Sequence, residues 1–130
     1  MSENFNLEII SPDKILLKTQ ATQVTIPSFE GLMSVLKDHI PLVTFLRPGF
    51  IEVKNDKENE RFFVEEGVVE FNDNNLLILS STVKDLKNIS KDEVNKMMKD
   101  SEEEIKKENI NDKEKYILSY KLESLKEIKQ

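Results

Sequence analysis

Cysteine is missing from this 130-residue chain, and histidine and glycine are scarce. Without cysteine the protein can form neither a disulfide nor a thiolate zinc site, and it has no thiol nucleophile. A single histidine excludes a metal site with two histidine ligands. The three glycines stand alone at positions 31, 49 and 67, so there is no glycine-rich loop for phosphate. These absences argue against an enzyme, a metal site and a cofactor.

Long apolar runs and an excess of positive charge are also lacking. No run approaches the roughly 20 residues that span a bilayer, and the N-terminus has neither a basic region nor an apolar signal core. We therefore expect the protein to stay on the side of the membrane where it is made. The net charge of −6 argues against nucleic-acid binding, because affinity for a phosphate backbone comes mainly from clustered Lys and Arg.

The charged residues divide the chain near residue 83. Residues 1–83 hold 7 Lys and Arg against 13 Asp and Glu, whereas residues 84–130 hold 12 of each. All of the net negative charge is thus in the front part. The back part has no proline or glycine, as a helical segment would. We predict two domains, residues 1–83 and residues 84–130.

Hydrophobic periodicity predicts that the first domain is built from strands. Its short apolar runs are rich in β-branched and aromatic residues, and turn-forming residues separate them. The runs are Phe5–Ile9, Lys14–Leu17, Gln23–Ile26, Phe50–Val53, Arg61–Val64, Val68–Phe71 and Asn75–Leu79. The connections are too short for crossover helices, so we expect a mainly β N-terminal sandwich or flattened barrel.

The second domain has a helical period. Ser90–Glu93 has the S-x-x-E form of a capping box, so a first helix should start there, with a thin apolar face that Ser101 interrupts. A turn is expected over Glu108–Asp112, with Asn111 or Asp112 capping a second helix. Two apolar stripes and a short connection predict a C-terminal antiparallel two-helix hairpin. Weak docking would make the hairpin mobile, and a fixed, well-solvated pair of terminal helices is the alternative.

The scarce residue types are concentrated in residues 30–49. That stretch holds the one histidine, His39, two of the four prolines and two of the three glycines. The simplest interpretation of His39 is a loop residue that is hydrogen-bonded near a turn. The alternative is a histidine at a contact surface, where titration near neutral pH modulates binding.

Six short segments carry a resemblance to a known family. They are Ile9–Pro12, Val24–Pro27, Glu30–Leu42, Leu46–Gly49, Phe63–Glu70 and Leu77–Ser80. In order and spacing they resemble the epsilon subunit of bacterial F-type ATP synthase, whose mitochondrial counterpart is called delta. The match covers most of residues 5–83, and the two-helix tail agrees in length and type.

The resemblance implies a non-catalytic rotor-stalk subunit of a proton-translocating F-type ATP synthase. In that family the sandwich binds the gamma subunit and sits on the ring of c subunits, at the cytoplasmic face of the bacterial cell membrane. The hairpin can fold on the sandwich or extend towards the catalytic alpha/beta head, where it restrains ATP hydrolysis. The alternative is a free-standing β-sandwich adaptor with a helical tail that binds an unrelated protein.

The same resemblance implies a site on the c-ring. The loop from Glu30 to Leu42 would face the ring, and Glu30, Met33 and His39 are the expected contacts. A polar loop of the c subunit needs charged and hydrogen-bonding partners of this kind.

The second helix carries the expected contacts with the beta subunit. Lys121, Lys126 and Lys129 match the basic residues that attract an acidic segment in the family. Glu123 and Glu127 lie among them and should weaken the attraction. We therefore expect modest, salt-sensitive inhibition of hydrolysis.

The sequence departs from the family pattern around the two turns. Ser34, Lys37 and Asp38 stand where the family commonly has Gly, Pro and Gly, so we expect a loop backbone with little demand for positive φ. Glu66 takes the first place of a usual Gly-Gly pair. Only Gly67 should then need a special backbone conformation.

A further departure concerns nucleotide. Some family members bind ATP through a motif Ile/Leu-Asp-x-x-Arg-Ala, and this chain has Ile89, Ser90, Glu93 and Val94 at the four defined positions. A carboxylate in place of the arginine would repel phosphate, which the forked donors of arginine would bind. We expect no ATP binding there. Saturable binding of ATP to the isolated subunit at sub-millimolar concentration would contradict this.

Overall fold

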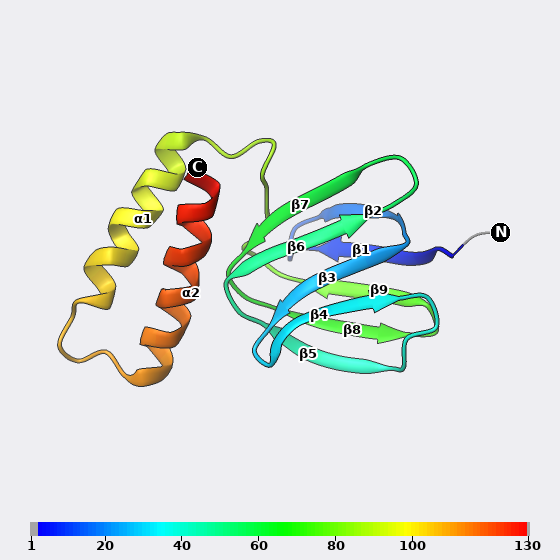
Figure 1. Cartoon of the computed structure of the whole chain (residues 1–130), viewed down its shortest axis with the longest axis horizontal. Coiled ribbons are helices and arrows are strands. Elements are labelled where there is room, and N and C mark those ends of the chain that lie inside the picture. Colours follow the sequence, from blue (N-terminus) through cyan, green and yellow to red (C-terminus); the bar gives the residue numbers. More distant parts are fainter. Residues whose placement is uncertain (1–2, 130) are drawn as a thin grey trace.

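A computed structural model describes residues 3–129 and shows a β-sandwich followed by two helices (Figure 1). The strands are β1 (Phe5–Ile10), β2 (Ile15–Ala21), β3 (Gln23–Ser28), β4 (Gly31–Leu36), β5 (Leu42–Leu46), β6 (Gly49–Lys54), β7 (Asn59–Val64), β8 (Gly67–Asn72), β9 (Asn75–Leu79) and β10 (Lys84–Asp85), and the helices are α1 (Lys91–Ile105) and α2 (Asp112–Lys129). The predicted fold class, a β-sandwich with a C-terminal helical hairpin, is confirmed.

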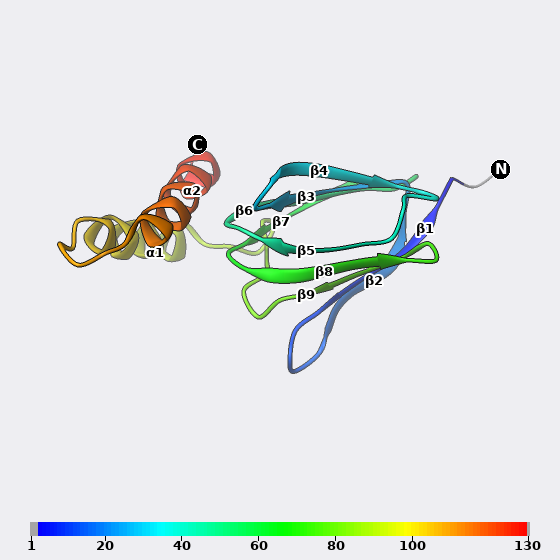
Figure 2. The same ribbon diagram turned by 90° about the horizontal axis from the view of Figure 1, so that it is seen from below.

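The strands form a sheet that folds over on itself into two layers (Figure 2). Hydrogen bonding joins them in the order β10-β7-β6-β3-β5-β8-β9-β1-β2, with β4 beside β3. The ladders are antiparallel except between β1 and β9, which run parallel. The domain boundary after residue 83 stays a prediction, and the next two residues add β10 to the edge of β7.

Alternation along the strands builds the core between the two layers. In β6, Ile51 and Val53 are buried while Glu52 and Lys54 face solvent. Side chains with no solvent exposure come from most of the strands: Leu7, Ile9, Ala21, Val24, Ile26, Val35, Ile51, Val53, Val64, Val69 and Ile78. Burying a valine, leucine or isoleucine side chain contributes about 1.5–3 kcal/mol, so this core is the main source of the sandwich's stability.

The segment predicted as a loop from Glu30 to Leu42 contains the six-residue strand β4, so the prediction of a loop is wrong for its first half. β4 pairs with β3 along its whole length, and Val24 faces Val35 in this ladder. Val35 is buried in the core while Leu36 is exposed, as expected of a strand at the edge of a half-buried sheet. Only the turns at its two ends remain irregular, and Gly31 enters β4 with a φ of 124°.

The expectation of little positive φ in this segment is also wrong, at Asp38. Asp38 has a φ of 66°, in the left-handed region. Its backbone N–H donates to Oδ1 of Asn74 at 2.7 Å, and Nδ2 of Asn74 donates to Oδ1 of Asp38 at 3.0 Å. Asp tolerates this conformation better than most residues, and the paired side chain of Asn74 stabilises it further.

Gly67 is required for space and not for a positive φ. Within residues 3–129, Gly31 is the glycine with a positive φ, so the expected special conformation at Gly67 is absent. A Cβ at Gly67 would lie 2.8 Å from the carbonyl oxygen of Leu79 and 3.0 Å from Cβ of Ser80. The glycine therefore lets β8 approach the end of β9 closely.

Local signals define both helices. The backbone N–H of Glu93 donates to Oγ of Ser90 at 3.1 Å, which confirms the predicted capping box at the start of α1. The N–H of Glu114 donates to Oδ1 of Asn111 at 2.8 Å, so Asn111 caps α2. Ser101 is as buried as the apolar residues of the hairpin, so its small side chain continues the packed face.

Candidate functional site

An open groove runs along the junction of the sandwich with α2. Its volume is about 1400 Å³, and it is lined by the turns at the hairpin end of the sandwich together with the first half of α2. Its apolar walls include Phe45, Val68, Leu79 and Ile117, and Glu65 is among its charged residues. The groove thus combines an apolar floor with acidic side chains.

The floor continues into a row of apolar side chains on the outer face of the sheet. Phe45 pairs with Val68, Val68 with Leu79, Leu79 with Ile10, and Ile10 with Ile15, so the row crosses five adjacent strands. Phe45 is 59% exposed and Ile15 is 56% exposed. Hereafter these five residues are the apolar row. A contiguous exposed row of this kind is typical of a protein-binding surface.

The next row of the same face mixes apolar and charged residues. Val43 pairs with Glu70, Glu70 with Leu77, and Leu77 with Glu8, which in turn faces Lys18. The apolar row is therefore bordered by two carboxylates and one lysine, and Glu70 is the carboxylate that does not face the lysine. This border favours a partner whose apolar surface is flanked by basic residues.

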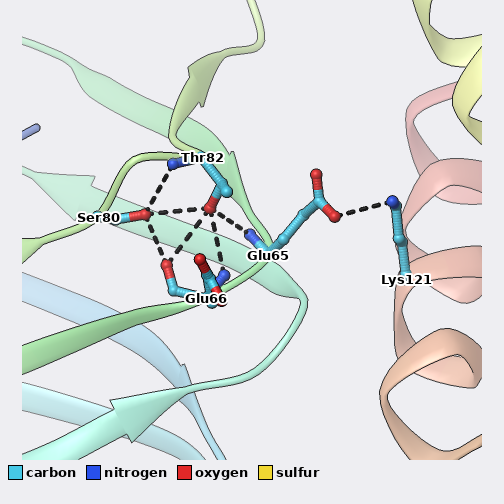
Figure 3. Close-up of polar contacts among 5 residues, drawn as sticks. All are labelled: Glu65, Glu66, Ser80, Thr82 and Lys121. Atoms are coloured by element: carbon cyan, nitrogen blue, oxygen red, sulfur yellow. Dashed lines mark hydrogen bonds and ion pairs between the residues drawn. The ribbon is translucent and has the colours of Figure 1, made fainter. Parts of the chain in front are cut away.

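A polar cluster lies where the groove meets the hairpin (Figure 3). Oγ1 of Thr82 accepts hydrogen bonds from the backbone N–H groups of Glu65 and Glu66, at 3.0 and 3.2 Å. The hydroxyl of Ser80 donates to the carbonyl of Glu66 at 2.6 Å. Oε1 of Glu65 lies 2.8 Å from Nζ of Lys121 on α2. The cluster thus connects the turn between β7 and β8 with the chain after β9 and with the hairpin.

Aromatic and cationic side chains hold α2 beside the sandwich. The guanidinium of Arg47 lies 3.8 Å from the centre of the Tyr120 ring, close enough for a cation–π interaction. The rings of Phe29 and Tyr116 stack with centroids 6.1 Å apart, and the hydroxyl of Tyr116 donates to the carbonyl of Phe29 at 3.4 Å. These contacts fix one face of α2 against the turns that close the sandwich.

A separate apolar cluster joins the two domains. Phe63 of β7, Val94 of α1 and Leu125 of α2 are buried together, and the half-buried Phe50 and Leu86 pack on them. We call Phe63, Val94 and Leu125 the hinge cluster. It is the part of the interface from which water is most completely excluded.

The structure does not bring the three predicted ring contacts together. Glu30 is exposed in the turn before β4, and His39 lies beyond the other end of β4, where its ring meets the edge of Phe71. Six residues of β4 lie between them, which span roughly 20 Å. Met33 packs on the core from the middle of the strand. His39 lies in a turn, with Nδ1 2.7 Å from the carbonyl of Ile40.

The three predicted contacts with the beta subunit differ in their surroundings. Lys121 is engaged by Glu65 and is only 18% exposed in this arrangement of the hairpin. Lys126 and Lys129 are exposed near the end of α2. A hairpin that left the sandwich would therefore free Lys121, whereas the other two are already accessible.

The four positions of the nucleotide motif serve the docking of the hairpin. Ser90 caps α1, Val94 belongs to the hinge cluster, and Ile89 packs against that cluster. Nζ of Lys84 lies 2.9 Å from Glu93, and this hydrogen-bonded lysine holds the pKa of the Glu93 carboxyl below its ordinary value. Within residues 3–129 no cluster of His, Asp and Glu side chains suits a metal ion.

Sequence reasoning missed the most connected residues of this site. Thr82 and Tyr120 make contacts with residues far away in the chain, so no local pattern marks them. The apolar row had a partial signal in Val43, Thr44 and Phe45, where apolar and polar residues alternate beside the expected family segment. Without the strand pairing, that signal did not show which face is exposed.

Comparison with known proteins decides the family. Residues 4–85 match the profile of the ATP synthase delta/epsilon chain β-sandwich domain. The chain belongs to this family. The epsilon chain of Pelagibacter ubique is 41% identical over 127 residues, which covers 97% of this chain and 98% of that one. The epsilon chain of Parvibaculum lavamentivorans is 30% identical over 130 residues and covers 99% and 98%. The chain is thus an ATP synthase epsilon subunit.

Solved structures show the same fold. A chain of the mitochondrial ATP synthase of Euglena gracilis superimposes with a TM-score of 0.80 at 21% identity, over 98% of this chain and 82% of that one. A chain of the Tetrahymena thermophila enzyme gives a TM-score of 0.64 at 16% identity, with 96% of each chain covered. Among the described residues of this epsilon subunit, no helix is both long and apolar enough to span a membrane.

Proposed function

We propose that this epsilon subunit couples the c-ring to the gamma subunit in the rotor of a proton-translocating ATP synthase. The solved structures it resembles come from assemblies described as F1/c-ring and as central stalk/c-ring. The observation that supports gamma binding is the apolar row, which would expose five side chains to water in a free subunit. Such a subunit works at the cytoplasmic face of the bacterial membrane, as a peripheral part of the complex.

The ring contact is proposed at Glu30. Its side chain is exposed at a turn, and the exposed Leu32 lies beside it on the outer face of β4. Met33 packs on the core, and His39 lies too far away to reach the same loop of a c subunit. We therefore narrow the predicted set of Glu30, Met33 and His39 to the first of these.

Replacing Phe45 by aspartate is expected to weaken gamma binding at least tenfold. The change puts a charge in the apolar row, where docking would have to desolvate it. Copurification with tagged gamma measures the effect. Leu36→Asp is the matched control, because Leu36 is an exposed apolar residue on β4, outside the row. Equal copurification of the Phe45→Asp variant and the wild type would refute the proposed surface.

We further propose that the hairpin contacts the alpha/beta head and modestly restrains ATP hydrolysis. In the reconstituted complex, a chain that ends at Asp85, and so keeps β10, should hydrolyse ATP faster than the full chain. The difference should shrink as salt rises, because Lys126 and Lys129 would act through exposed charge. Equal rates for the two complexes at low salt would rule out the restraint.

The expected lack of ATP binding at the motif positions remains a proposal. The structural roles of these positions support the proposal, because each helps to cap or dock the hairpin: Ile89, Ser90, Glu93 and Val94.

A further inference from the structure

We propose that Thr82 is a positioning residue that sets Glu65 to receive Lys121, and thereby couples the chain between the domains to the docking of the hairpin. The proposal rests on the proposed restraining function of the hairpin, since it names a polar contact that adds to the hinge cluster in holding the hairpin docked. Thr82 lies between β9 and β10, and its hydroxyl makes its bonds within the sandwich and not to α2. Its effect on docking must therefore pass through the turn between β7 and β8.

The direction of each hydrogen bond in the cluster follows from counting protons. A serine or threonine hydroxyl has one proton to donate and two lone pairs to accept with. The hydroxyl of Ser80 gives its proton to the carbonyl of Glu66 at 2.6 Å. The single proton of Thr82 then has two acceptors within reach, Oγ of Ser80 at 3.0 Å and the carbonyl of Glu66 at 3.3 Å, and we assign it to the nearer one. The backbone N–H of Thr82 fills the other lone pair of Ser80, at 3.1 Å.

The same count leaves both lone pairs of Thr82 for the turn. The backbone N–H groups of Glu65 and Glu66 occupy them at 3.0 and 3.2 Å. Every proton and lone pair of the two hydroxyls is thereby used, and the backbone of the turn is held at both successive residues. A network in which each member is satisfied is rigid, and removing one member leaves the partners unpaired.

This rigid turn presents Glu65 to the hairpin (Figure 3). The side chain of Glu65 is 29% exposed, Nζ of Lys121 lies 2.8 Å from Oε1 of Glu65, and the lysine side chain is 18% exposed. By contrast, the side chains of the other ion pairs described are all at least 40% exposed. Breaking an ion pair that is shielded from water costs more than breaking an exposed one, because a partly desolvated charge is left without its partner. Thr82 holds the geometry of this pair from the neighbouring segment.

The hydrogen bonds of Thr82 lie within the sandwich and do not require the docked hairpin. If the chain after β9 moves, the turn loses the acceptor of two N–H groups and Glu65 is no longer fixed. If the hairpin leaves the sandwich, the turn keeps its hydrogen bonds to Thr82, and Glu65 stays in position to bind Lys121 again. The segment between the domains therefore favours docking only while Thr82 is in place.

Distances between spin labels test the proposal in the full chain. Because the natural chain has no cysteine, Asp56→Cys and Lys107→Cys place two labels on exposed turns, one in each domain. In this labelled protein, Thr82→Val should lower the ratio of docked to undocked hairpin roughly five- to tenfold, because two N–H groups lose their acceptor. Thr82→Ser keeps the hydroxyl and should restore the wild-type distances. An unchanged distance distribution in Thr82→Val would overturn the proposal.

A double-mutant cycle separates positioning from a general loss of stability. Lys121→Met should lower docking by itself, and in that background Thr82→Val should change the docked ratio less than twofold. An equal effect of Thr82→Val with and without Lys121 would overturn the proposal. Thr25→Val is the matched control, because the Thr25 hydroxyl also pairs with a serine hydroxyl, Oγ of Ser34, at 3.0 Å.

A second variant keeps the test decisive if Thr82→Val folds poorly. Glu65→Gln leaves the backbone of the turn intact and removes the charge that Lys121 meets, so it should reproduce the loss of docking without a change in the unfolding of the sandwich. Wild-type docking in Glu65→Gln would contradict the proposal. These measurements use the isolated chain and not ATP hydrolysis, so their outcome is independent of whether the hairpin restrains the catalytic head.

Discussion

Replacement of Leu125 by alanine is expected to release the hairpin while leaving the sandwich folded. Leu125 has no solvent exposure and packs with Phe63 and Val94 in the hinge cluster. Loss of a buried leucine side chain costs about 2–5 kcal/mol. The cation–π contact of Arg47 with Tyr120 contributes about 0.5–2 kcal/mol, and an exposed ion pair such as that of Arg61 with Glu127 about 0–1 kcal/mol. The hinge cluster is therefore the dominant restraint on the hairpin.

Hydrogen exchange provides the measurement. In the Leu125→Ala variant the amides of α1 and α2 should exchange much faster, whereas those of β6 and β8 should keep their protection. Ile117→Ala is the matched control, because Ile117 lines the open groove on the same helix and is only half-buried. Unchanged protection of α2 in Leu125→Ala would show that polar contacts alone hold the hairpin.

Replacement of Gly67 by alanine is expected to destabilise the sandwich by about 1–3 kcal/mol, the usual cost of forcing extra volume into a packed site. The added Cβ would meet the backbone carbonyl of Leu79 at 2.8 Å and Cβ of Ser80 at 3.0 Å. A backbone carbonyl in a ladder cannot rotate away as a flexible side chain can. The strain would also disturb Ser80, and with it the cluster that holds Glu65.

Denaturant unfolding measures this effect as a lower midpoint with an unchanged slope. Glu66→Ala is the control, because it changes the neighbouring exposed side chain and keeps the backbone bonds of the turn, so its effect should stay within about 0.5 kcal/mol. Wild-type stability of Gly67→Ala would show that β8 and β9 can move apart to accept the methyl group.

Local sequence patterns were sufficient to predict both helices, most of the strands and the family. The alternation of β6, the capping serine at position 90 and Asn111 as the cap of α2 are all properties of a few neighbouring residues. They could be predicted because the physical cause lies within one turn of helix or one strand. The six family segments could be recognised for the same reason, because each consists of a few neighbouring residues.

The errors came from contacts between distant segments. The positive φ of Asp38 depends on the side chain of Asn74, and the need for glycine at position 67 depends on Leu79 across the ladder. The prediction of a loop over Glu30–Leu42 came from the family resemblance, whereas the pairing of β4 with β3 determines the conformation of its first half. Thr82 was missed for the same reason, since its partners are 16 and 17 residues away.

The parallel ladder between β1 and β9 determines when the sandwich can close during synthesis. Asn6 bonds with Asn75, which lies 69 positions later, so the first strand made must wait for the ninth. Until β9 leaves the ribosome, β1 can pair only with β2. The free edge of β1 in this pair of strands then stays open to other chains. The hairpin domain follows β9 in the chain, so its docking surface is complete before α2 is made.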